Sequence, residues 1–170
     1  MSGLTTYETA YLVGGRGRAA LVAFIALAAD GRLDVAYGRQ RVKVARDEAT
    51  DRIETAALAL VPESGLTVAE FIEQVAATEP VKALNAAVVA KGLLRPLRWF
   101  SPAYRELVAH PGTGLHRVAV LGVPGIEDER LRDVLEHPRP EVPKVARHKS
   151  VTDNTTDGTI GPNQNSFYGP

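Results

Sequence analysis

The sequence contains no cysteine, and this absence excludes a whole group of functions. Without cysteine there is no disulfide framework, no thiolate zinc site, no nucleophilic thiol and no thioether-bridged product. The chain also lacks an excess of charge of either sign, because 20 Lys and Arg residues balance 20 Asp and Glu residues. It therefore has no overall basic field that would attract nucleic acid and no acidic field that would repel it.

Long hydrophobic runs and a secretion signal are lacking as well. The longest uncharged apolar run, residues 19–29, is shorter than the roughly 20 residues that a membrane-spanning helix needs. The first residues have neither the basic start nor the apolar stretch of a signal peptide. We therefore expect a soluble cytoplasmic protein without a membrane partner. Its 45% hydrophobic and 24% charged residues predict a globular fold.

The composition changes near residue 138, where three prolines fall within six residues. This pattern predicts an extended linker over residues 138–149 rather than a helix. Residues 150–170 are polar, rich in Thr, Asn and Gly, and nearly free of aliphatic side chains. Such a segment buries too little apolar surface to offset its ordering entropy. We therefore expect residues 150–170 to form a disordered C-terminal tail.

The first 137 residues contain an internal repeat in which Gly31 matches Gly92, an offset of 61 residues. Each copy has a short helix opened by a threonine, a turn, a longer apolar helix and a closing glycine. The expected helices are residues 6–13 and 18–29 in the first copy, and residues 67–77 and 80–91 in the second. After Gly31, residues 33–37 and 41–45 alternate with period two, which predicts a β-hairpin around residues 38–40.

Helix, turn, helix and hairpin is the order of a winged helix. We therefore expect a mostly helical α+β fold of tandem winged-helix-like units, followed by the disordered tail. The other expected elements are a helix over residues 46–61, a weaker second hairpin over 93–100, a helix over 103–109, a strand over 115–123 and a charged helix over 127–136. The expected boundaries are 1–48 and 65–114 for the two units, 49–64 for the connecting helix, 115–137 for the strand and closing helix, 138–149 for the linker and 150–170 for the tail.

The usual function of a winged helix is DNA binding, which needs polar side chains on the recognition helix. Residues 18–29 offer only Arg18 and the nearby Arg16, and a helix that is apolar all round is buried or packs against a partner. The second candidate helix carries Lys82, Asn85 and Lys91. Arg39, Arg41 and Lys43 in the hairpin suit phosphate contacts or a solvated turn. The sequence therefore disfavours nucleic acid as a partner.

Winged helices also dock proteins, through a groove between the third helix and the wing. An apolar helix beside an exposed hairpin edge suits that use. The candidate partner-binding residues are Leu21, Phe24, Ile25, Tyr37, Arg41, Val42, Val81, Leu84 and Val88. The expected partner is a peptide-modifying enzyme or another protein, and a homodimer is a further option.

Signals for catalysis are poor, so we expect a protein that is not an enzyme and has no catalytic residues, metal or cofactor. The histidines, His110, His116, His137 and His148, lack the spacing of a metal site. Residues 14–18 precede a helix and resemble a phosphate-binding turn, but the Lys-Ser/Thr pair of a P-loop is missing. A tight turn between helices is the favoured interpretation, and anion binding is a minor alternative.

Residues 4–15 read Leu-Thr-Thr-Tyr-Glu-Thr-Ala-Tyr-Leu-Val-Gly-Gly and match the pattern LxxYExAYLxGG. This opening resembles that of a poorly characterised bacterial family with a tandem helical domain, and residues 122–135 resemble the segment that ends this domain. Family members often carry a membrane segment and a Gly- and Cys-rich tail, neither of which is evident here. Some lie beside genes for multinuclear iron oxidases that modify ribosomally made peptides. The resemblance implies a substrate or partner role and supplies no catalytic residues.

A folded recognition domain followed by a polar tail is the layout of a peptide precursor. In the first hypothesis residues 1–137 dock a modifying enzyme, which acts on residues 150–170. The candidate modified residues are Asn163, Asn165, Ser166, Phe167 and Tyr168, or the set Thr152, Asp153, Thr155, Thr156, Asp157 and Thr159. The alternatives are a winged-helix adaptor that binds a peptide or protein, and a DNA-binding transcriptional regulator.

Overall fold

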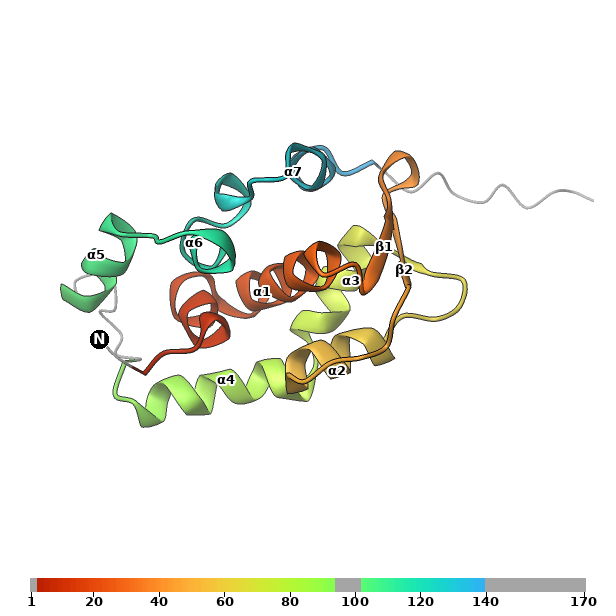
Figure 1. Ribbon diagram of the computed structural model, residues 1–170. Helices are drawn as coiled ribbons and strands as arrows, with labels where there is room; N and C mark the ends of the chain where they lie inside the picture. The colour runs from red at the N-terminus through yellow and green to blue at the C-terminus, as the bar shows by residue number, and fades with distance from the viewer. Residues whose placement is uncertain (1–2, 94–101, 140–170) are drawn as a thin grey trace, which may run out of the picture. The chain divides into compact units, whose positions relative to one another are not determined.

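A computed structural model describes residues 3–93 and 102–139, which are mostly helical and include a small antiparallel sheet (Figure 1). The helices are α1 (Thr6–Ala29), α2 (Arg52–Ala59), α3 (Val68–Ala76), α4 (Glu79–Ala90), α5 (Pro102–Ala109), α6 (Gly114–Leu121) and α7 (Glu129–Glu136). The strands are β1 (Leu33–Ala36), β2 (Arg41–Val44) and β3 (Leu66–Thr67), and the 3₁₀ turns are η1 (Tyr37–Arg39) and η3 (Val123–Gly125). The expected α+β class, mostly helical, is confirmed.

Some expected segments lie outside the described residues. These are all but Leu93 of the second hairpin, most of the linker, and the tail with all its candidate modified residues. The described chain up to Arg139 belongs to one compact unit.

Helix α1 occupies the centre of that unit, between α4 and α6 in Figure 1. It packs against α2, α3, α4 and α6, and residues 19–27 are all buried. Phe24 meets Phe71 of α3 with their ring centroids 5.9 Å apart and their planes tilted by 59°. A tilted pair of buried aromatic rings adds to the stability that area burial alone provides. The core is therefore built around the second half of α1.

Helix α1 also has the length and composition of a membrane span, because it extends well beyond the apolar run of residues 19–29. Its most apolar 18-residue window is 56% buried inside the fold. A buried core helix of a globular protein meets the same criteria, and the packing of α1 is of that kind.

The expected break between two helices within residues 6–29 is confirmed at Gly15. This residue has φ 73° and ψ −159°, a backbone conformation that only glycine adopts readily. The first half of α1 is capped by Thr5 rather than by the expected Thr6. The Thr5 hydroxyl accepts from the Glu8 amide at 3.1 Å, and the Glu8 carboxylate accepts from the Thr5 amide at 2.7 Å. Together these two bonds form a capping box.

The helices of the two expected copies begin and end with the same capping motifs. Thr67 and Glu70 form a second capping box at the start of α3. Gly31 and Gly92 have φ values of 65° and 69°, as expected for the glycines that close α1 and α4. The Arg32 amide donates to the carbonyl of Leu27, and the Leu93 amide donates to that of Val88. With the bonds from the two glycine amides, each end is a Schellman motif.

The first hairpin is confirmed as β1 and β2, which pair Asp34 with Lys43 and Val35 with Val42. Leu33, Val35 and Val42 are buried on one face of the sheet, as the period of two requires. Strand β3 adds to β2 by pairing Leu66 with Val42. Because β3 precedes α3, the hairpin of the first copy shares its sheet with the start of the second copy.

Two expected elements differ in the structure. The helix expected over residues 46–61 is α2, which begins only at Arg52 because the Asp51 side chain caps it by accepting from the Ile53 amide at 2.7 Å. The strand expected over residues 115–123 is wrong, because this segment forms α6. A short apolar run does not distinguish a strand from a buried helix by its period. Helices α5 and α7 confirm the expectations for residues 103–109 and 127–136, with starts shifted by one or two residues.

The opening motif has structural roles. The Tyr7 hydroxyl donates to Glu54 of α2 at 2.9 Å, and burial together with this contact raises the pKa of Tyr7. Glu8 pairs with Lys91 at the end of α4 at 2.7 Å. Burial opposes ionisation of Glu8, but the hydrogen bonds from Lys91 and Thr5 outweigh it and lower its pKa. Tyr7 and Glu8 thus tie the start of α1 to two other helices.

We expect Gly15→Ala to lower the free energy of unfolding by about 1–3 kcal/mol, because alanine is strained in this conformation. Gly17→Ala is the matched control, since a Cβ at Gly17 meets no atom within 4 Å and its backbone is helical. That change should raise stability by about 0.5–1 kcal/mol. Urea denaturation measures both variants, and equal effects of the two changes would contradict the break at Gly15.

We expect Glu8→Gln to destabilise the fold by about 1.5–3 kcal/mol at pH 7, the range for hydrogen bonds to charged groups. Since the folded pKa of Glu8 is lowered, its contribution is complete above its ordinary pKa of 4.5 and is lost as the pH falls through the folded value. The difference between Glu8→Gln and wild type should therefore shrink at pH 3, as measured by urea denaturation. Glu106→Gln, on an exposed position of α5, should be neutral at both pH values.

Candidate docking site

Most of the predicted partner-binding residues lie in the core. Their side chains are at most 9% exposed, so they offer no surface to a partner, and that assignment is corrected. These residues are Leu21, Phe24 and Ile25 of α1, Val42 of β2, and Val81, Leu84 and Val88 of α4. The physical reason is that the apolar helix of residues 18–29 is surrounded by the protein's own helices.

The hairpin residues have different positions. Tyr37 is 37% exposed at the hairpin tip. Arg41 is half-buried and donates to the Gly65 carbonyl at 2.8 Å, so it ties β2 to the loop before β3. Arg39 and Lys43 are exposed. Tyr37 is thus the predicted contact residue that a partner can reach most directly.

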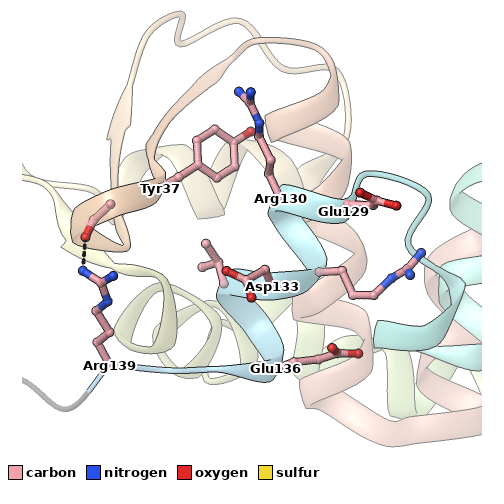
Figure 2. A pocket seen from close by; sticks show the side chains of 9 residues that line it. Tyr37, Glu129, Arg130, Asp133, Glu136 and Arg139 are labelled. Atoms are coloured by element: carbon pink, nitrogen blue, oxygen red, sulfur yellow. Dashed lines mark hydrogen bonds between the residues drawn. The ribbon is translucent and has the colours of Figure 1, made fainter.

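A groove of about 670 Å³ lies between the hairpin tip and α7. Figure 2 shows the ring of Tyr37 pointing toward the side chain of Arg130, while Arg139 reaches the hairpin tip from the far end. The side chains labelled there are Tyr37, Glu129, Arg130, Asp133, Glu136 and Arg139. Helix α7 supplies most of this lining. Asp128 caps its start, and the buried Leu131 and Val134 pack it against the core. We call this feature the tip groove.

The tip groove carries both signs of charge. Its lining includes three carboxylates from α7 and the guanidinium groups of Arg130, Arg132 and Arg139. Two of these cations have carbonyl partners, since Arg132 donates to Ile126 and Arg139 donates to Gly38 at 2.6 Å. Burial, and then the carboxylate of Asp128, raise the pKa of Tyr37. This arrangement can pair with an extended polar peptide.

The chain leaves the described domain beside the tip groove. The Gln40 side-chain amide donates to the His137 carbonyl at 2.7 Å, and its oxygen accepts from the Arg139 amide at 2.6 Å. Together with the bond from Arg139 to Gly38, these contacts fix residues 137–139 to the hairpin tip. We call them the exit clamp.

The glycine-rich segment of residues 14–18, which was considered as an anion-binding turn, has a structural role through Arg18. Arg18 is half-buried, and its guanidinium donates to the Val120 carbonyl at 2.9 Å and to that of Ala119 at 3.4 Å, at the C-terminal end of α6. A Cβ at Gly122 would lie 2.6 Å from the guanidinium carbon. Arg18 thus satisfies carbonyls that the end of α6 leaves without partners. Its charge is directed at the protein itself.

Other chemistry finds little support among the described residues. No group of three or more His, Asp and Glu side chains in residues 3–93 and 102–139 is placed to hold a metal ion. Of the cations on the second candidate DNA helix, Lys82 pairs with Glu79 and Lys91 with Glu8, each at 2.7 Å.

Sequence reasoning missed Gln40, Arg139 and the α7 face of the tip groove. The charged helix over residues 127–136 was predicted, but nothing in its sequence indicated that its polar face lies next to the hairpin. Gln40 lies 97 to 99 positions before its partners, so no local pattern connects them. The only local signal was the position of Gln40 in the hairpin turn.

We expect Arg18→Ala to lower the free energy of unfolding by about 1–3 kcal/mol, because it leaves the α6 carbonyls without their donor. Arg16→Ala is the matched control, since Arg16 is exposed on the same turn, and it should change stability by less than about 0.5 kcal/mol. Urea denaturation checks both variants. Equal effects would show that the Arg18 contacts contribute nothing specific.

Comparisons of this chain with protein-family models, curated proteins and solved structures found no match. The resemblance of residues 4–15 to the bacterial family therefore stays a prediction. Function has to follow from the tip groove, the exit clamp and the chemistry of the chain itself.

Proposed function

We propose that the folded domain is a recognition domain without catalytic activity of its own. It docks a peptide-modifying enzyme at the tip groove and delivers residues 150–170 as the substrate. The observation that carries this proposal is the exit clamp, which holds residues 137–139 beside a groove with the polar lining that suits a protein contact. The start of the C-terminal segment and the docking surface thus lie side by side.

Docking near the exit point makes a weakly binding tail an efficient substrate. A tethered segment reaches an active site at an effective concentration set by the length of its tether. Residue 150 follows Arg139 by 11 positions, so it lies within about 40 Å of the clamp even when the chain is fully extended, at about 3.3–3.6 Å per residue. An enzyme seated on the tip groove therefore has the first tail residues within reach.

The same proposal treats each copy as a winged-helix-like unit. In the first copy, the two halves of α1 are followed by the β1–β2 hairpin. In the second, α3 and α4 follow the same order with the same capping boxes and Schellman ends. The apolar helix of the first unit is buried, which leaves the hairpin as the part of that unit available to a partner. This favours docking through the wing.

A second candidate is an adaptor that binds an extended peptide at β1. In the sheet of the described residues, β1 is an edge strand. The Ala45 amide donates to the Arg32 carbonyl, so the antiparallel alternation directs the main-chain groups of Leu33 and Val35 away from β2. A peptide strand can add to such an edge. The transcriptional regulator has less support, because its first recognition helix is buried.

Intact-mass measurement of the protein from its native source tests the proposal. We expect a mass different from that of the unmodified sequence, with the change mapped by fragmentation to residues 150–170. An unmodified mass in cells that also express the neighbouring genes would contradict the precursor role. Deleting residues 140–170 separates the two candidates, since an adaptor keeps its partner without the tail.

The docking surface is tested by reversing charge on α7. The double change Asp133→Lys and Glu136→Lys alters two exposed side chains of the tip groove and should lower the modified fraction by at least about tenfold. Glu106→Lys, on an exposed position of α5, is the matched control and should leave the modified fraction unchanged. An equal loss in both variants would place the docking surface elsewhere.

A further inference from the structure

Gln40 has an unusual backbone. Among the described residues it is the one non-glycine residue with a positive φ, at 50°, and its ψ of 42° places it in the left-handed region. Glycine and asparagine adopt this conformation more readily than glutamine does. A residue held in such a region points to a compensating interaction or a function.

The contacts of Gln40 provide the compensation. Its main chain is bonded on both sides, since its amide donates to the Tyr37 carbonyl in the turn and its carbonyl accepts from the Val68 amide at the start of α3. Its side-chain amide is the part that bonds the His137 carbonyl and the Arg139 amide. A primary amide that donates to one peptide group and accepts from another resembles the pairing between two strands. Both hydrogen bonds of the Gln40 side chain therefore go to main-chain groups of residues 137–139.

The sequence prepares the segment for this contact. Arg139 stands between Pro138 and Pro140, and a residue before proline favours the extended region. Proline at 138 also narrows the conformations of the free segment, which lowers the entropy lost when the segment is held. Arg139 still has an amide to donate, which a third proline would lack. Its side chain adds the bond to Gly38.

We infer that Gln40 is a positioning residue that fixes where the C-terminal segment leaves the domain. In this role the amide side chain at position 40 holds the chain at Arg139, beside the tip groove. Without it the main chain of residues 137–139 loses both of its bonds to the hairpin tip, and the exit clamp keeps only the side-chain bond from Arg139 to the Gly38 carbonyl. The consequence for modification of residues 150–170 rests on the proposed function, but the clamp itself does not.

Gln40→Gly tests this inference, because glycine accepts the left-handed conformation without strain. Amide hydrogen exchange in the full chain should show the Arg139 amide exchanging about three- to tenfold faster than in wild type, the range for one net hydrogen bond. The Val68 amide is the internal control, since it donates to the main chain of residue 40 and should keep its rate. An unchanged rate at Arg139 would overturn the inference.

Two further variants cover the other outcomes. Should Gln40→Gly speed exchange at Val68 as well, Gln40→Asn decides, because asparagine tolerates the left-handed region but its shorter side chain cannot span both partners. Faster exchange at Arg139 alone in that variant supports the clamp, and an unchanged rate there overturns it. Arg139→Ala removes only the contact to Gly38, so its own amide should stay protected. Loss of that protection would assign the positioning to the guanidinium of Arg139 and overturn the role of Gln40.

The role of Gln40 and the proposed precursor function are tested by different measurements, so one can be contradicted without the other. Where the native protein is modified, Gln40→Gly should lower the modified fraction of residues 150–170 several-fold while its unfolding midpoint stays near that of wild type. A modified fraction equal to wild type would show that the clamp does not position the substrate. An unmodified native protein would contradict the precursor role and leave the exchange result at Arg139 as it is.

Discussion

The burial of residues 19–27 in α1 is the constraint on which the rest of the structure depends. A helix that is apolar on every side must be covered on every side, and here α2, α3, α4 and α6 provide the cover. The small alanines in this stretch let neighbouring helices approach, while Phe24 fills the gap toward Phe71. Arg18, just before this stretch, donates a hydrogen bond to the Val120 carbonyl near the C-terminal end of α6. The hairpin follows Gly31 directly, so the core helix also determines where the hairpin tip lies.

Local signals made much of the fold predictable. Capping threonines and aspartates, closing glycines and the period-two hairpin act within a few residues, so the sequence alone shows them. The start of α2 was missed although its Asp51 cap is a signal of this local kind. The identity of α6 was different, because it depends on packing. Residues 115–121 are apolar enough for a strand or a helix, and their contact with α1 favours the helix. The glycines on either side, Gly114 and Gly122, mark its ends in the structure.

The candidate site was harder to predict because its parts are distant in the sequence. An apolar helix has two explanations, a buried core or a docking face, and composition does not choose between them. The structure buries Leu21, Phe24 and Ile25, so the proposed docking surface is the polar side of the hairpin instead. There Tyr37 and Gln40 meet residues that follow them by about a hundred positions. Of the predicted partner-binding residues, only the exposed Tyr37 also lines the tip groove.

The residues of the opening motif and those of the exit clamp differ in what explains them. Tyr7, Glu8 and Gly15 are explained by contacts inside the domain, to Glu54, to Lys91 and through the break in α1. These contacts give the motif a structural role, and the motif by itself identifies no activity. Gln40 is different, because glycine would serve the turn with less strain. The side-chain amide of Gln40 is best explained by its bonds to the main chain of residues 137–139.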